Sequence, residues 1–307
     1  MILKIYFYPK ESDLNKRIDI FLSENMDKSR SGVQNLIKNN KVFANDKIVK
    51  ANYKITNENL EIIVEEEEPK DIKVVPQDIP LDLLYEDEDV LIVNKPKGMV
   101  VHPAPGHPDN TLVNAVLYHC KGELPGINGE IRPGIVHRID QNTTGSLVIA
   151  KTEKALNSLA EQFKSHSITR EYVAIVIDNI KEDEGTIETT IGRSLNDRKK
   201  MSINVRNGRD AITHFKVLER FGEYTYVSCR LETGRTHQIR VHMASIKHPV
   251  LGDVEYGPKK SPIKNLQGQT LHARVLGFIH PTTGKYIEVS APLPEYFEKL
   301  LNKFRKK

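Results

Sequence analysis

With 307 residues, 38% of them hydrophobic, the chain has enough apolar material for one large domain and a smaller one. No apolar run approaches the roughly 18 to 20 residues that span a membrane, the start lacks a signal-peptide pattern, and the two distant cysteines indicate neither a disulfide framework nor a cysteine metal site. The net charge of +4 divides into +3 over residues 1–64, −9 over 65–89 and +10 over 90–307. We therefore expect a cytoplasmic protein with a polyanionic partner, and nucleic acid rather than a membrane, because no basic amphipathic helix has a bulky apolar face.

The first 64 residues predict two helices followed by short strands. Apolar residues at helical spacing form one stripe on each helix: Leu14, Ile18, Phe21 and Leu22, then Val33, Leu36 and Ile37. Short strands are expected over 41–44, 48–49 and 60–64, with a turn at Asn45 and Asp46. A unit of this size is too small to be an enzyme by itself.

This stretch resembles an S4 domain, a small RNA-binding module, over roughly residues 14–64. The likeness is carried by Arg17 to Leu22, Ser29-Arg30-Ser31, Gln34 to Ile37 and Val42 to Lys54. In that family the polar face of the second helix and the loop after it meet the RNA backbone. The resemblance therefore implies RNA contacts from Arg30, Lys38 and Lys41, which would position the protein without reading sequence.

An acidic, proline-containing stretch follows the first unit. Four consecutive glutamates, residues 65–68, precede Pro69, and Pro76 and Pro80 favour extended backbone. The sequence thus predicts an S4-like domain at 1–64, a linker at 65–80 and, at 81–307, a domain that is large enough to be catalytic.

The larger part predicts more strands than helices, many of them joined as hairpins. Expected strands cover 83–85, 90–93, 147–150, 170–177, 186–190, 211–218, 224–231, 273–278 and 286–289, and expected helices cover 111–118, 156–163, 236–245 and 295–304. We predict a mixed α/β (α+β) body with a largely antiparallel sheet. The glycines of 122–134 do not lead from a strand into a helix, which argues against a dinucleotide-binding fold.

Asp140 lies in a turn between the approach Ile135 to Ile139 and the apolar strand 147–150, where loops held by rigid elements often carry chemistry. By itself it is better explained as an aspartate that caps its own turn. A kinase loop is rejected because Ile139 separates Arg138 from Asp140 and no phosphate-covering glycine loop precedes it. His237 and His242 do not have zinc-protease spacing, and we expect no metal.

Four ordered motifs change the interpretation of Asp140. Leu84 to Pro103, Arg132 to Lys151, Arg170 to Tyr172 and Leu231 to Met243 resemble, in this order, the motifs of RluA-family pseudouridine synthases. Together with the S4-like start they point to the RluD-like branch and its pseudouridine synthase fold. Thr144 stands where serine is frequent and Ile139 where leucine is frequent, and both changes are mild.

The resemblance implies a role for several residues. Asp140 matches the catalytic aspartate, Arg235 the arginine that pairs with it, and Tyr172 the aromatic residue that stacks on the target base and can transfer a proton. Ile239 matches an apolar wall of the uracil pocket. The remaining expected substrate contacts are His137, Arg138 and Thr143.

The expected reaction detaches uracil from a uridine and rejoins it through C5, without metal or cofactor. The expected substrate is a structured stem-loop of large-subunit (23S) ribosomal RNA, free or in an assembling particle, bound by a monomer. A basic hairpin tip over 196–209 would guide it through Arg198, Lys199 and Lys200. Asp140 could attack C1′, add to C6 or remove a sugar proton. Two other readings stay open: a non-catalytic ribosome-assembly factor, and an N-glycoside hydrolase, which would need a second carboxylate.

Overall fold

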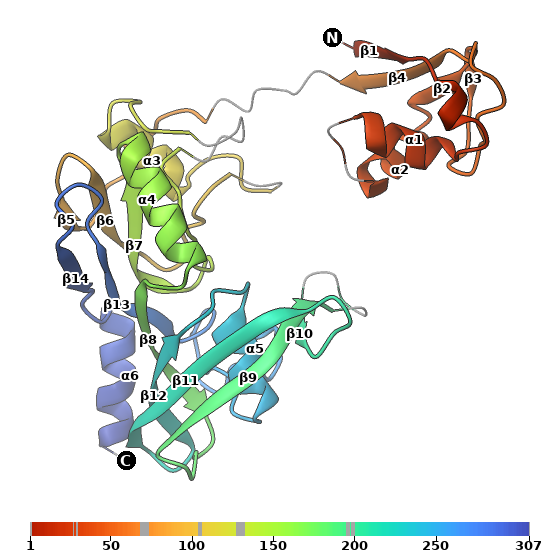
Figure 1. Ribbon diagram of the computed structural model, residues 1–307. Helices are drawn as coiled ribbons and strands as arrows, with labels where there is room; N and C mark the ends of the chain where they lie inside the picture. The colour runs from red at the N-terminus through yellow and green to blue at the C-terminus, as the bar shows by residue number, and fades with distance from the viewer. Residues whose placement is uncertain are drawn as a thin grey trace. The chain divides into compact units, whose positions relative to one another are not determined.

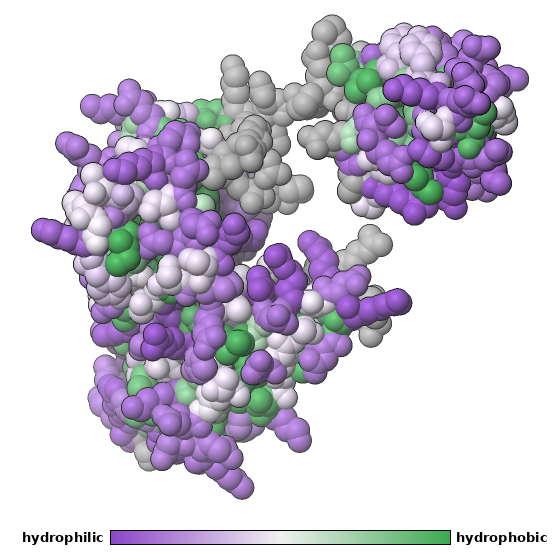
Figure 2. All heavy atoms as spheres, viewed as in Figure 1, coloured by the Kyte–Doolittle hydropathy of each residue, from purple (hydrophilic) through white to green (hydrophobic). Residues whose placement is uncertain are grey.

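The structure, a computed structural model, describes residues 2–26, 28, 30–67, 74–103, 106–126, 133–194, 197 and 200–306. The chain divides into two compact units, Met1–Ile72 and Lys73–Lys307 (Figure 1). Hydrophilic residues cover much of the face shown in Figure 2. Among the described helices, none is long and apolar enough to cross a membrane. The finer division with a linker at 65–80 stays a prediction. The end of that stretch belongs to the second unit, where Asn114 Nδ2 donates to Val75 O at 2.8 Å.

The first unit is a four-stranded antiparallel sheet with two helices. Its elements are β1 (Ile2–Phe7), a 3₁₀ turn (Glu11–Asp13), α1 (Ile18–Asn25), α2 (Arg30–Lys38), β2 (Val42–Ala44), β3 (Lys47–Ile48) and β4 (Ile62–Glu67). The strand order is β1-β4-β2-β3. β1 has no counterpart among the predicted strands, because its partner β4 lies about sixty residues away and both Leu3 and Tyr6 remain half exposed.

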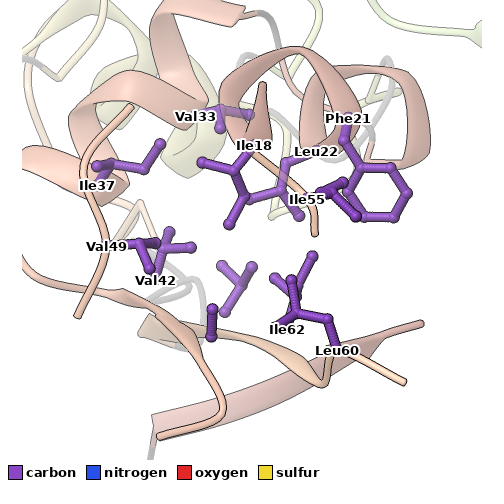
Figure 3. Packing of buried hydrophobic residues seen from close by; sticks show 12 residues of the cluster. Ile18, Phe21, Leu22, Val33, Ile37, Val42, Val49, Ile55, Leu60 and Ile62 are labelled. Carbon is purple, nitrogen blue, oxygen red and sulfur yellow. The ribbon is translucent and has the colours of Figure 1, made fainter. Parts of the chain in front are cut away.

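The core of this unit lies between the helices and the sheet. Figure 3 shows Ile18 and Leu22 of α1 and Val33 of α2 directed toward the strand residues Val42 and Ile62. α1 begins at Ile18, later than the stripe from Leu14 suggests. The reason is local: the backbone before it is held by a hydrogen bond from Ile18 N to Tyr53 O of 2.8 Å.

The second unit is built on one ten-stranded sheet. Its strands are β5 (Leu83–Glu86), β6 (Val90–Lys95), β7 (Thr144–Ala150), β8 (Thr169–Ile177), β9 (Glu184–Arg193), β10 (Met201–Ile203), β11 (Arg209–Arg220), β12 (Tyr224–Leu231), β13 (Leu271–Ile279) and β14 (Tyr286–Ser290). The order is β10-β9-β11-β12-β8-β13-β7-β6-β5, with β14 paired to β13. Among the strand pairs described, only β13 with β7 is parallel, so the predicted largely antiparallel mixed sheet is confirmed.

Helices cover both faces of this sheet, and the alternation of side chains along the strands shows how. In β6, Leu91 and Val93 pack with α3 (Leu112–His119), whereas Val90 and Ile92 pack with α4 (Glu153–Lys164). Farther along the sheet, α5 (Gln238–Ser245) and α6 (Glu295–Arg305) belong to separate clusters in the same way. Tyr172 of β8 contacts both the α3 and the α5 clusters, so these two helices share the face on which it lies.

Candidate active site

A buried lysine donates hydrogen bonds to the loop that carries Asp140. Lys95, at the end of β6, is fully buried, and its Nζ donates to Pro96 O, Met99 O and Gln141 O at 2.9, 2.8 and 3.0 Å. Burial lowers the pKa of Lys95 to about 7, and the negative charge of Asp140 opposes that shift. Lys95 therefore joins the loop after β6 to the residue that follows Asp140.

The Asp140 carboxylate lies beside a buried arginine on α5. Arg240 Nη1 donates to Asp140 Oδ2 at 3.0 Å, and the arginine side chain is only 5% exposed. The same guanidinium donates to both oxygens of Asp253, at 2.6 and 2.9 Å, and to Glu255. Burial alone would lower the pKa of Arg240, but Asp253, Asp140 and Glu255 raise it above its ordinary value. A permanently charged group at this distance stabilises the ionised form of a carboxylic acid.

The predicted pairing of Arg235 with Asp140 is wrong in this structure, where Arg240 holds that position. Arg235 precedes α5, and its Nε donates to Asp210 O at 2.8 Å while its backbone N–H donates to Gln238 Oε1 at 2.9 Å. Arg240 lies within the helix, one of six consecutive buried residues from Gln238 to Met243. An arginine inside such a buried helix needs acidic partners, but the burial is seen only in the structure, so the sequence offered no signal that favoured Arg240 over Arg235.

A cavity of about 60 Å³ adjoins Asp140 and brings most of the predicted site residues together. Thr143, Tyr172 and Ile239 line it with Asp140, and Arg138 and Arg235 also reach it. Burial raises the pKa of Tyr172; the charge of Arg170 opposes this and that of Asp140 adds to it, so the phenol keeps its proton near neutral pH. Ile239 is buried and offers an apolar wall.

His137 serves the loop itself. Its Nε2 accepts the backbone N–H of Val148 at 3.0 Å, and its ring stacks on Phe163 with centroids 4.5 Å apart. Burial, with a smaller effect of the charge of Arg170, lowers the pKa of His137 to about 3. A neutral ring in this place anchors the loop to β7, and a contact of His137 with substrate stays a prediction.

Two larger openings meet at Asp140 and differ in charge. One, about 420 Å³, is lined by cationic side chains that include Arg138, Lys164, Arg209 and Arg235. The other, about 360 Å³, carries the carboxylates of Asp253 and Glu255 and the amides of Gln141, Asn142 and Gln269. Within the described ranges, no three His, Cys, Asp or Glu side chains are grouped so as to hold a metal ion.

The predicted RNA contacts outside this site have different surroundings. In the first unit, Arg30 Nε donates to the buried Asp19 at 3.1 Å, and Lys38 is exposed. Lys41, between α2 and β2, is half-buried. Beyond β9, Lys200 Nζ donates to Glu255 O at 2.6 Å. Arg198 and Lys199 lie outside the described residues.

The site combines one carboxylate beside a fixed arginine, a protonated tyrosine and an apolar wall. Comparison with known proteins agrees with this geometry. The family model for RNA pseudouridylate synthase matches residues 89–245, a range that contains Asp140, Tyr172 and Arg240. The chain belongs to this family. It is an RNA pseudouridine synthase, an isomerase, and its residues 16–62 match the S4 domain. Both predicted resemblances are confirmed.

Relatives of this synthase cover nearly its whole length. The uncharacterized RNA pseudouridine synthase YlyB of Bacillus subtilis is 51% identical over 298 residues, which is 96% of each chain. Ribosomal large subunit pseudouridine synthase D of Vibrio vulnificus is 40% identical over 310 residues, or 97% of this chain and 93% of the relative. The solved structure of human RNA Pseudouridylate Synthase Domain Containing 1 is 26% identical with a TM-score of 0.56, and it covers 78% of this chain and 98% of that one.

Proposed function

We propose that this synthase converts specific uridines of large-subunit ribosomal RNA into pseudouridine, with Asp140 as the catalytic carboxylate. The observation that carries the assignment of Asp140 is its contact with Arg240, which is buried, fixed by two further carboxylates and directed at one oxygen only. The substrate class is supported by relatives named ribosomal large subunit pseudouridine synthase D.

The three possible routes ask the same of Asp140. Attack at C1′, addition to C6 and removal of a sugar proton all need an ionised carboxylate with one oxygen free to react. Arg240 occupies Oδ2, which leaves Oδ1 for the uridine. Tyr172 offers an aromatic face to the base and a protonated phenol that can donate a hydrogen bond, and Ile239 offers an apolar wall. These residues support one site for all three routes.

The target uridine must leave its stack to reach Oδ1, at a cost of a few kcal/mol. We assign the flanking phosphates to the cationic opening, where Arg138, Lys164, Arg209 and Arg235 would offset that cost. Arg235 thus becomes a binding residue in place of the partner of Asp140.

Further RNA contacts are proposed away from the site, at Arg30, Lys38 and Lys41 of the first unit and at Arg198, Lys199 and Lys200 of the hairpin. A ribosomal substrate would place the enzyme in the cytoplasm, where we expect it to act as a monomer. Changing Lys38 or Lys199 to Glu should weaken RNA binding and make the slope of affinity against salt shallower by about one. An unchanged slope would remove that lysine from the interface.

The decisive experiment compares wild-type protein with Asp140→Asn on ribosomal RNA labelled with tritium at C5 of uracil, because joining the base through C5 releases that hydrogen. We expect tritium release and a C-linked base from wild-type protein and neither from Asp140→Asn. Free uracil among the products would identify a hydrolase instead. Mapping of pseudouridines in cells that carry Asp140→Asn tests the assembly-factor reading, since that reading leaves the modification pattern unchanged.

A further inference from the structure

His237 is a second side chain at the Asp140 carboxylate. It lies immediately before α5, and its Nε2 is 3.8 Å from Asp140 Oδ1, whereas Arg240 Nη1 contacts Oδ2 at 3.0 Å. His237 also lines all three cavities that meet at Asp140. Each carboxylate oxygen therefore has its own neighbouring donor group, and the one beside Oδ1 is the imidazole.

Two oxygen-bearing side chains lie near Nδ1 of His237. Tyr256 Oη lies 2.7 Å from it and accepts the backbone N–H of Met201 at 2.8 Å, and Glu255 Oε2 lies 3.8 Å from the same nitrogen. Burial raises the pKa of Tyr256 to about 12, so its hydroxyl keeps a hydrogen that it can donate to an unprotonated Nδ1. Burial also lowers the pKa of His237, against the charge of Asp140. A neutral imidazole that accepts at Nδ1 bears its proton at Nε2, the nitrogen that faces Asp140.

The side chain of His237 does not cap the helix that follows it. The φ of His237, 58°, lies in the left-handed region, which costs a non-glycine residue about 1 kcal/mol. Glycine would suit this backbone better. Strained backbone of this kind is concentrated at functional sites, where the role of the side chain offsets the energetic cost of the strain.

We propose that His237 is a positioning residue for the reaction: its Nε2–H directs Oδ1 of Asp140 toward the uridine, and Tyr256 holds the required tautomer. The proposal rests on Asp140 being the catalytic carboxylate. The separation of 3.8 Å closes when the uridine binds, as catalytic hydrogen bonds do when the site is completed. The arrangement also links this pair to the β9–β10 hairpin, because Met201 donates to Tyr256 and Lys200 to Glu255 O.

His237→Gly removes the imidazole and its hydrogen bond to Tyr256 but relieves the backbone, so folding stability should change little. We expect kcat on an RNA substrate to fall by about 10²-fold, the loss typical of a misplaced reacting group, with KM changed by less than about threefold. Tyr256→Phe, which keeps the ring under Arg240 but frees the tautomer, should lower kcat by roughly tenfold. The double variant His237→Gly/Tyr256→Phe should be no slower than His237→Gly, because Tyr256 acts through His237.

Matched controls separate this role from a general effect on folding. Tyr286→Phe makes the same chemical change on β14, and His214→Ala removes an imidazole that contacts Glu232 and Thr186 on the sheet; both should keep wild-type kcat. Wild-type kcat in His237→Gly, or losses that multiply in the double variant, would overturn the proposal, as would a loss confined to KM. If Asp140→Asn is inactive while His237→Gly is not, only the role of His237 fails; an active Asp140→Asn removes the catalytic assignment itself.

Discussion

Replacement of Arg240 by Gln separates the two arginines of the α5 motif. In the structure, Arg240 joins three carboxylates, Asp140, Asp253 and Glu255, and Gln would leave them close together without a cation. Removing one partner of a buried ion pair costs roughly 3–5 kcal/mol of folding stability. Arg240→Lys keeps the charge but cannot reproduce the forked contact with Asp253, so it should lose part of that amount.

Catalysis should respond to Arg240→Gln in a way that folding stability alone does not explain. Without the guanidinium at Oδ2, the Asp140 carboxylate loses the hydrogen bond and the fixed positive charge that orient it. Loss of electrostatic stabilisation should lower kcat at neutral pH by about 10²-fold or more.

Arg235→Gln is the matched control, since it makes the same change five residues earlier in the chain. Arg235 contacts Asp210 O and lines the cationic opening, so we expect weaker RNA binding, seen as a higher KM, with kcat close to the wild-type value. Single-turnover tritium release over a range of RNA concentrations, with the folded fraction checked by circular dichroism, measures both variants. If Arg235→Gln lowers kcat and Arg240→Gln does not, the assignment drawn from the structure is refuted.

Three further changes test the framework around the site. Lys95→Met should alter the pH dependence of stability: wild-type Lys95 has a folded pKa of about 7, below its unfolded value, so the unfolded chain binds more protons between about pH 7 and 10. Wild-type stability should then rise relative to Lys95→Met by up to about 1.4 kcal/mol per pH unit in that range, and parallel curves in urea titrations would contradict it. Gly145→Ala would place a Cβ 2.2 Å from Ala273 O between β7 and β13. Gly284 also has a positive φ, but a Cβ there would meet no described atom within 4 Å. Gly145→Ala should therefore lower the melting temperature far more than Gly284→Ala. Equal losses would show that backbone strain and not contact decides. In the first unit, burial of Asp19 would raise its pKa, but hydrogen bonds from Arg17, Gln34 and Arg30 lower it to about 2. This carboxylate therefore stabilises the fold above about pH 4, and its contribution of about 1–2 kcal/mol is lost as the pH falls toward 2. Asp19→Asn should remove this pH dependence in hydrogen-exchange measurements of α1 and α2.

What the sequence predicted well was local. Asp140, Tyr172 and Ile239 each lie within a motif that the family resemblance identified, and all three line one cavity. The fold class could be predicted because the strands are short and their apolar and polar residues alternate, a pattern that can be recognised within each segment. β1 was missed because its pairing with β4 depends on a distant segment and leaves no clear alternation.

What the sequence could not decide depended on contacts between distant segments. Arg235 and Arg240 stand in the same motif, and which of them meets Asp140 depends on where α5 begins. The helix starts at Gln238, whose side chain accepts the backbone N–H of Arg235, and only then does Arg240 face Asp140 and the acidic turn beyond the helix. No spacing rule contains that information. Lys95 was missed for the same reason, because its carbonyl partner at Gln141 lies 46 residues away.

The unequal sharing of Arg240 explains how a carboxylate can be both held and reactive. A forked contact with Asp140 would fix that side chain more firmly, but it would also place the cationic guanidinium on Oδ1, the oxygen assigned to the uridine. Here Arg240 makes the forked contact with Asp253 and donates a further hydrogen bond to Glu255. Asp140 accepts a single hydrogen bond, at Oδ2. The guanidinium is therefore immobilised by residues that do not react, which places its charge before substrate arrives. The remaining oxygen, Oδ1, has two lone pairs, so it can accept the Nε2–H of His237 with one and use the other toward the uridine.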